Sequence, residues 1–388
     1  MTTDFNYIFI YKSEGSYDQM KITCSKSNLL NGVQTVYKAV PSKTTMSILE
    51  CILINASSDT IKLTANDMEL GIETIIDGTI IEKGIIALDA KILFEIVRKL
   101  PDNEVTIETD ESLKTTIKCE KANFNIIGKS GDDFSYLPKL EKNEPLIISQ
   151  FTLKEVVRQT IFSIADSDNN KLMTGELFEI NENMLKVVSL DGHRISIRKI
   201  ELKNSYENKK VVVPGKTLNE VSKILSGDTD KDIFIYFTDK NIIFEFDSTV
   251  VVSRLIEGEY FKIDQMLSND YETKFQINKK EFLDCIDRAT LLVKEGDKKP
   301  IIINILDTTM ELKINSTVGS MNEEIDIEKA GKDLMIGFNP KFLIDALRVI
   351  DDEIITLYMV NPKAPCFIKN DQESFIYLIL PVNFNTVN

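Results

Sequence analysis

The 388-residue chain has no tryptophan, one histidine, and only 16 glycines and 10 prolines. Because His193 is the single imidazole, a histidine-rich metal site is excluded. The small share of Gly and Pro excludes collagen-like and low-complexity chains. No apolar run approaches the roughly 18 residues of a membrane span, and the apolar stretch at residues 7–11 is too short for a signal peptide. We therefore expect a globular protein of the cytoplasm, without metal or cofactor.

The cysteines are also few, and they are scattered. No two of them form a C-x-x-C pair, and their odd number does not suit a framework of disulfides. Reduced thiols in a cytosolic protein fit this pattern better, and such cysteines usually act as small core residues. We therefore expect core positions for Cys24, Cys51, Cys119, Cys285 and Cys366.

Positive charge is in short supply on average. The chain carries 46 Lys and Arg against 61 Asp and Glu, which gives a net charge of −15 and a pI near 4.8. Such acidity opposes non-specific binding to nucleic acid and to anionic membranes. This average conceals an uneven distribution along the chain.

What the chain does have is a segment that occurs three times, at residues 90–100, 215–225 and 340–350. Each copy has a lysine in second place, an acid four residues later, and apolar residues at helical spacing. The three lysines, Lys91, Lys216 and Lys341, are 125 residues apart each time. A period of that length indicates three duplicated domains rather than a solenoid of short repeats.

The same order of predicted elements surrounds each repeat. A helix opens each copy, at residues 28–36, 152–164 and 280–293. Pairs of strands follow, such as residues 51–56 with 60–65 and residues 176–180 with 185–189. Three more strands come after each repeat, at 104–108, 113–119 and 123–127, at 232–237, 241–247 and 249–255, and at 354–359, 366–369 and 374–380. This order predicts an α+β fold, with two helices and about eight mostly antiparallel strands in each of three similar domains.

Polar, charged stretches near residues 139–145 and 267–270 are typical of domain boundaries. We predict an N-terminal extension at residues 1–19, to which we assign no fold. The three domains are then expected at residues 20–142, 143–268 and 269–388.

The charges are divided unequally between helices and the rest of the chain. Six windows that cover the predicted helices carry 15 Lys and Arg against 9 Asp and Glu, which leaves 31 bases and 52 acids elsewhere. A general preference of helices for lysine explains such a bias in one helix. Because all the helices are less acidic than the rest, we favour one basic surface made of helices, facing a polyanion, and an acidic surface made of sheets.

Three stretches carry a resemblance to a known family: Thr45-Met46-Ser47-Ile48-Leu49, residues 189–195 (Ser-Leu-Asp-Gly-His-Arg-Ile) and residues 377–382 (Tyr-Leu-Ile-Leu-Pro-Val). From residue 20 to residue 384 the chain resembles the β subunit of bacterial DNA polymerase III, the sliding clamp. The resemblance implies the DNA clamp fold, a head-to-tail homodimeric ring of six domains whose helices line a hole for double-stranded DNA. It also implies a processivity factor that does no chemistry and tethers polymerase, clamp loader and repair proteins through short peptides.

The resemblance implies three sets of site residues. A hydrophobic pocket for partner peptides, between the middle and last domains, comprises Met173, Leu190, Gly192, His193, Arg194, Ile195, Phe261, Met266, Asn339, Phe342, Pro365, Leu378, Leu380, Pro381 and Val382. The DNA-facing residues are Lys43, Lys91, Lys216 and Lys341. The dimer interface pairs Phe124 and Ile126 of one chain with Leu291 and Leu292 of the other. We expect Asn339, Arg194 and backbone amides to supply the polar groups that orient a peptide in the pocket.

Two alternatives stay open at this point. Asp191 and His193 could belong to a hydrolytic triad, but no G-x-S-x-G or P-loop motif accompanies them, so we favour a strand-to-turn corner in which Gly192 takes an unusual backbone angle. The chain could also be an acidic three-domain scaffold or binding module that never meets DNA.

The chain departs from the family pattern at Ser47 and Phe261, where proline is usual, and in the residues 1–19 that precede the usual start. Because proline fixes φ, both replacements are expected to alter local turn geometry.

Overall fold

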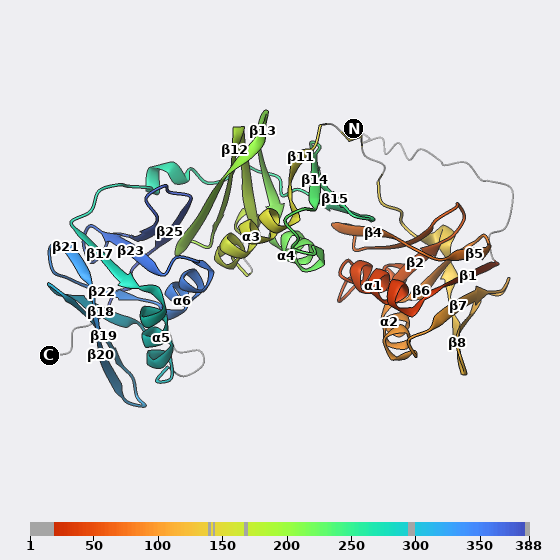
Figure 1. Cartoon of the computed structure of the whole chain (residues 1–388), viewed down its shortest axis with the longest axis horizontal. Coiled ribbons are helices and arrows are strands. Elements are labelled where there is room, and N and C mark those ends of the chain that lie inside the picture. The colour runs from red at the N-terminus through yellow and green to blue at the C-terminus, as the bar shows by residue number, and fades with distance from the viewer. Residues whose placement is uncertain (1–18, 139–140, 143, 167–169, 294–298, 385–388) are drawn as a thin grey trace. The chain divides into compact units, whose positions relative to one another are not determined.

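A computed structural model describes residues 19–138, 141–142, 144–166, 170–293 and 299–384. The predicted extension at residues 1–19 therefore lies outside the described residues except for Gln19. The chain divides into two compact units (Figure 1). The first comprises residues Met1–Glu141 and Ile243–Val252, and the second comprises Lys142–Ile242 and Ser253–Asn388.

The described residues form six α-helices that pack in pairs, α1 with α2, α3 with α4 and α5 with α6. Their bounds are α1 Lys26–Tyr37, α2 Ala90–Lys99, α3 Gln150–Thr160, α4 Gly215–Ile224, α5 Lys279–Thr290 and α6 Pro340–Val349. Five of the six begin where a Ser, Asp or Asn side chain accepts a hydrogen bond from an amide of the first turn, as an N-cap does. The helices predicted from spacing are confirmed, with two differences at their ends. Helix α3 ends at Thr160 and a 3-10 turn, Ile161–Ser163, continues it, and α5 ends at Thr290 rather than at residue 293.

The first unit contains two antiparallel sheets (Figure 1). One has the strand order β5-β1-β7-β8-β9, and the other contains the order β10-β6-β2-β3-β4. The strands are β1 Met20–Ser25, β2 Cys51–Asn55, β3 Ile61–Asn66, β4 Leu70–Ile76, β5 Thr79–Glu82, β6 Ile85–Asp89, β7 Glu104–Thr109, β8 Lys114–Cys119, β9 Ala122–Ile127 and β10 Lys129–Ser130. Helices α1 and α2 cover the inner faces, where Leu29, Val33, Leu93 and Val97 are fully buried.

The second unit is built around a sheet of order β12-β13-β25-β24-β23-β17-β21 and a smaller one of order β20-β19-β18-β22. The remaining strands of the chain are β11 Leu146–Ser149, β12 Gly175–Leu190, β13 Arg194–Pro214, β14 Asp232–Phe237, β15 Asn241–Phe246, β16 Thr249–Arg254, β17 Thr273–Asn278, β18 Ile301–Ile305, β19 Thr309–Asn315, β20 Ser320–Asp326, β21 Glu328–Gly331, β22 Leu334–Phe338, β23 Ile354–Met359, β24 Cys366–Lys369 and β25 Phe375–Ile379. The larger sheet joins strands of the predicted middle and last domains, and this joint positions the candidate site.

Strand β12 includes both segments predicted as a strand pair, residues 176–180 and 185–189. Glu182 between them has a positive φ of 53°. The Nζ of Lys186 lies 3.3 Å from Oε2 of Glu179, although seven residues of straight strand would span about 23 Å. The chain therefore folds back at Glu182, as a pair of adjacent strands requires.

All five cysteines are free thiols in the core, as expected from their scattered positions. Burial raises the pKa of Cys24, Cys285 and Cys366 to about 12, so these thiols stay protonated and unreactive at neutral pH. No helix among the described residues is long and apolar enough to cross a membrane.

Candidate functional site

The candidate site lies where β13 pairs antiparallel with β25. Arg194 stands opposite Ile379, and Ile195 stands opposite Leu378. These residues are close to two hundred positions apart in the sequence, and their pairing joins the predicted middle and last domains. The backbone hydrogen bond from the Leu380 amide to the His193 carbonyl, at 2.9 Å, extends this joint by one more contact.

Five of the predicted pocket residues meet in one apolar cluster over this joint. Leu190, Ile195 and Leu378 are buried members of the cluster, and the partly buried Met173 and Phe261 pack against it. The ring of Phe261 also makes an edge contact with the Tyr260 ring, at a centroid distance of 5.5 Å. Phe261 therefore supplies apolar surface to the cluster.

The turn between β12 and β13 has the geometry that the sequence predicts. Gly192 has φ of +84°, and an added Cβ would meet no atom within 4 Å, so backbone conformation alone favours glycine here. Asp191 Oδ1 accepts hydrogen bonds from the backbone amides of His193, at 2.9 Å, and Arg194, at 3.1 Å. The Asp191 carboxylate therefore serves the turn and the Arg194 side chain, which disfavours the triad interpretation.

Arg194 is a buried cation, only 6% exposed, that connects three elements. Its Nε donates to Asp191 Oδ2 at 2.9 Å, its Nη1 donates to Asp345 Oδ2 of α6 at 2.6 Å, and its Nη2 donates to the Phe162 carbonyl. The guanidinium also lies over the rings of Phe342, 4.6 Å from the centroid, and Phe162, at 5.4 Å. Every nitrogen of the guanidinium is thus engaged inside the protein.

Arg194 and Asn339, from which we expect polar groups for a peptide, also have structural roles. Arg194 holds the contacts described above, and Asn339 is the N-cap of α6, where its Oδ1 accepts from the Lys341 amide at 3.1 Å. Phe342, which lies under the Arg194 guanidinium, stacks on the exposed His193 ring at a centroid distance of 5.8 Å. These two rings add aromatic surface to the site.

The remaining predicted pocket residues lie at the rim. Leu380 is 37% exposed and follows β25, and Val382 donates its amide to the Gly337 carbonyl, which holds the C-terminal segment beside β22. Pro365 and Pro381 are half-buried, whereas Met266, at the end of the 3-10 turn Ile263–Met266, is 52% exposed. Residues 385–388, which we considered as neighbours of the pocket, lie outside the described residues.

Asp345 and Phe162 are functional neighbours that the sequence analysis missed. The repeated segment did contain a signal, because an acid follows each repeat lysine by four residues. In the first two copies this acid pairs within its own helix, Glu95 with Arg98 and Glu220 with Lys223. In the third copy Asp345 pairs with Arg194, 151 residues away, so the same position has acquired a tertiary role.

The predicted DNA-facing lysines are all exposed. Lys91, Lys216 and Lys341 are each the second residue of their helix, α2, α4 and α6. Lys43 lies in the loop after α1, as expected. The three repeat lysines thus occupy equivalent places at helix N-termini, where the helix dipole adds positive potential.

The predicted dimer residues lie on two surfaces at sheet edges and helix ends. Phe124, 38% exposed, and Ile126 are on β9, which is the last strand of its sheet. Leu291, 80% exposed, follows α5, and Leu292 packs against the core of the last domain.

Comparisons with known proteins agree with this geometry. Three family models of the DNA polymerase III beta subunit match the chain: the N-terminal domain at residues 20–138, the central domain at 147–262 and the C-terminal domain at 264–383. The beta sliding clamp of Staphylococcus epidermidis RP62A is 34% identical over 376 residues, which cover 94% of this chain and 99% of the relative.

Solved structures are similar as well. A candidate DNA polymerase III beta subunit from Eubacterium rectale ATCC 33656 is 76% identical, with a TM-score of 0.92 over 94% of this chain and 100% of the other. The DNA polymerase sliding clamp of Bacillus subtilis is 33% identical, with a TM-score of 0.91 over 95% of this chain and all of the other.

Proposed function

Because the chain belongs to the family of DNA polymerase III β subunits, the sliding clamps, we propose that it encircles double-stranded DNA as a homodimeric ring. It performs no chemistry and tethers polymerase, clamp loader and repair proteins in the cytoplasm. The tether raises the local concentration of a partner at the DNA, so that rebinding becomes effectively intramolecular. The observation that carries the proposal is the match of all three domains over nearly the whole chain.

The strand pairing between β13 and β25 supports ring closure, because the same two kinds of strand lie at the ends of other sheets. In the last domain, β25 ends a run of three strands that follows α6, and β9 ends the corresponding run after α2. The partner of β25 is the Arg194–Arg198 part of β13, which corresponds to β20 in the last domain. Within the described residues, β9 and β20 are both end strands of their sheets. A second copy that pairs its β20 with β9 repeats the internal joint, and two such contacts close a ring.

The dimer contact that we propose has a small apolar core. Phe124 and Ile126 of one chain meet Leu291 and Leu292 of the other beside the paired edge strands. The domains that take part in the ring are those predicted at residues 20–142, 143–268 and 269–388.

The proposed DNA-facing residues are Lys43, Lys91, Lys216 and Lys341. Their contacts are with phosphates, which carry no sequence information and permit sliding. The proposed peptide site is the apolar cluster of Leu190, Ile195 and Leu378 with its walls Phe261 and Phe342. A partner peptide buries Leu or Phe anchors there, as short segments do in preformed apolar pockets.

The decisive test combines topology with dimerisation. The protein, loaded by its cognate clamp loader, should stay on nicked circular DNA and leave once the circle is cut to a linear form. Leu292→Asp should lower the molar mass in solution to that of a monomer and abolish retention. The control Leu306→Asp changes a side chain that is 39% exposed in the same domain, and it should leave both readouts unchanged.

Two results would contradict the proposal. Equal retention on circular and linear DNA would mean that the ring does not enclose DNA. A protein that never binds DNA under these conditions would favour the acidic scaffold.

A further inference from the structure

A cleft of about 600 Å³ lies in the middle domain. Leu177 of β12 and Val212 of β13 form its apolar floor, and residues 255–265 form its wall. Two contacts tether this wall to the sheet, the bridge between Ile256 and Val212 and the 3.1 Å ion pair between Asp264 and Lys186. The cleft is therefore preformed.

Glu179, Lys186 and Lys210 line the cleft and pair with one another. The carboxylate of Glu179, 11% exposed, accepts from Lys210 Nζ at 2.6 Å and lies 3.3 Å from Lys186 Nζ. Burial raises the pKa of Glu179, but the hydrogen bond from Lys210 and the charge of Lys186 together hold this pKa below its ordinary value. Because Lys186 also pairs with Asp264, this group contains two lysines and two carboxylates and has no net charge that would attract an anionic ligand.

The rim of the cleft, in contrast, carries carboxylates that are not paired among the described residues. Asp239, Glu257 and Glu259 line it and are exposed, and within the described part of the chain no ion pair joins any of them to a basic residue. Lys262 also lines the cleft and is exposed, so these three carboxylates and one lysine give the rim a net charge of −2. Such a rim beside apolar residues complements a segment in which Lys or Arg stands next to an apolar side chain.

The cleft also shares its apolar surface with the proposed peptide pocket. Phe261 lines the cleft and at the same time packs against the cluster that contains Leu190, Ile195 and Leu378. The floor residues Leu177 and Val212 belong to that same cluster. The cleft and the proposed peptide pocket are therefore built on the same apolar cluster.

We propose that the cleft binds a basic, amphipathic segment of the same partner protein whose apolar anchors occupy the pocket. This inference rests on the proposed function, because it assumes that partners dock there. One apolar side chain of the segment covers Leu177 and Val212, and its Lys or Arg groups meet Asp239, Glu257 and Glu259. Proteins that act on DNA carry basic surfaces, so such segments are common among replication and repair partners.

The test uses the full-length protein and three synthetic peptides. The first is a short peptide with Leu and Phe anchors, taken from the clamp-binding segment of the cognate polymerase. The other two add, at the end nearer the cleft, eight residues that alternate Leu with Lys or Leu with Glu; both ends are tried. Because the added contact is tethered to the first, the Lys extension should tighten binding at least tenfold at low salt, and the Glu extension should not. Most of the gain should be lost at 0.5 M NaCl, where exposed charges are screened.

Three variants distinguish binding in the cleft from a general effect of net charge. Glu257→Lys with Glu259→Lys should remove the gain from the Lys extension and leave the affinity of the unextended peptide within twofold. The matched control Asp352→Lys with Glu353→Lys makes the same change in net charge at exposed residues outside the cleft, and it should keep most of the gain. Val211→Trp fills the cleft without a change in charge and should also remove the gain.

The outcomes distinguish the two proposals. If the unextended peptide fails to bind, the peptide pocket itself is misplaced. If the unextended peptide binds but the Lys extension gives no gain, or both charge variants reduce the gain equally, the cleft is not a binding site for a basic segment and the pocket stands.

Discussion

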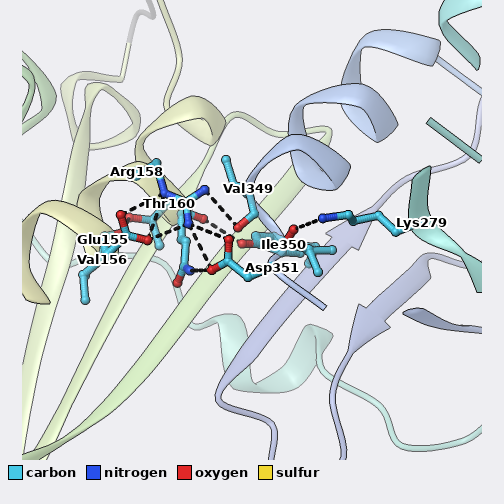
Figure 2. A network of polar contacts seen from close by, with 10 residues as sticks. Glu155, Val156, Arg158, Thr160, Lys279, Val349, Ile350 and Asp351 are labelled. Atoms are coloured by element: carbon cyan, nitrogen blue, oxygen red, sulfur yellow. Dashed lines mark hydrogen bonds and ion pairs between the residues drawn. The ribbon is translucent and has the colours of Figure 1, made fainter. Parts of the chain in front are cut away.

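Two arginines connect the middle and last domains, and they differ chiefly in burial. Arg194 reaches Asp345 of α6 at 2.6 Å, with side-chain exposures of 7% and 22%. Arg158 of α3 reaches Asp351, just beyond α6, at 3.1 Å, with exposures of 36% and 73%. Figure 2 shows the Arg158 group, in which the guanidinium also bonds Glu155 of its own helix and the Val349 carbonyl, beside the bond from Lys279 to the Ile350 carbonyl.

This difference in burial determines how much stability is lost when one partner of an ion pair is removed. An exposed ion pair is screened and contributes about 0–1 kcal/mol, because water solvates each partner when the other is removed. A buried pair adds little net stability over an apolar pair, but the loss of one partner leaves the other charge desolvated. The Arg158 group therefore adds little to the stability of the joint, whereas Arg194 is needed to keep two carboxylates and two aromatic rings in place.

The largest effect is expected for Arg194→Met. This change leaves Asp191 and Asp345 without their cation and removes the plane on which Phe342 rests. We expect the free energy of unfolding to fall by about 3 kcal/mol, measured by urea denaturation. The partner peptide should bind at least tenfold more weakly, because the Phe342 wall is no longer held.

A readout specific to the site accompanies this variant. His193 and Phe342 stack in the native protein, so the imidazole proton shifts in NMR should move toward those of an unstacked ring in Arg194→Met. Unchanged shifts and unchanged peptide affinity, despite the loss of stability, would mean that Arg194 supports the fold alone.

Glu176 sharpens the comparison, because its carboxyl group is buried without a charged partner among the described residues. Glu176 of β12 is fully buried, and neither of its carboxylate oxygens has a hydrogen-bond partner in the described structure. Desolvation by burial raises its pKa from 4.5 to about 8. Where Arg194 keeps its charge by pairing, Glu176 gives up its charge.

This shift predicts the sign of the pH dependence. Between pH 4.5 and 8 the folded protein holds a proton on Glu176 that the unfolded chain releases, so rising pH favours unfolding. The stability that the neutral carboxyl permits is complete below pH 4.5 and is lost by the time the pH exceeds 8. The free energy of unfolding should therefore fall by up to about 1.4 kcal/mol per pH unit in this window.

The measurement is urea denaturation at several pH values from 5.5 to 7.5. Glu176→Gln should remove most of this slope and should be more stable than the parent at pH 8. Glu179→Gln is the control in the same strand: Glu179 is paired with lysines, so its loss should lower stability by the same amount at each pH. A parent slope that survives in Glu176→Gln would place the titrating group elsewhere.

Much of this architecture is readable from local patterns. The helices and the three-fold repeat follow from spacing, and the apolar members of the site follow from the family resemblance. The role of Arg194 cannot be predicted in this way, because its partner Asp345 is 151 residues away and neither local sequence pattern indicates the contact. The protonation state of Glu176 is equally hard to predict from the sequence. Glu176 and Glu179 lie on opposite faces of their strand, but both faces are buried. The alternation of side chains therefore does not show which of the two carboxylates has a partner.

The third-largest effect is expected for Leu380→Ala, an uncharged substitution at the rim of the pocket. Leu380→Ala should weaken the partner peptide by about 2 kcal/mol, or roughly thirtyfold, as the loss of an interface anchor does. Because Leu380 is 37% exposed, the free energy of unfolding should change little, in contrast to Arg194→Met. Leu306→Ala, at a similar exposure in the same domain, should affect neither quantity. A loss of stability as large as that of Arg194→Met would show that Leu380 belongs to the core.

The smallest effect is expected for Arg158→Met, which tests the comparison directly. Its ion pair with Asp351 is exposed, so the free energy of unfolding should fall by only about 0.5–1 kcal/mol, and 0.5 M NaCl should reduce this difference further. A double-mutant cycle with Asp351→Asn should give a coupling energy near 0.5 kcal/mol, well below that of the matching cycle with Arg194→Met and Asp345→Asn. The peptide affinity of Arg158→Met should stay within twofold of the parent. Equal coupling energies in the two cycles would mean that geometry, rather than burial, decides what an arginine contributes to this joint.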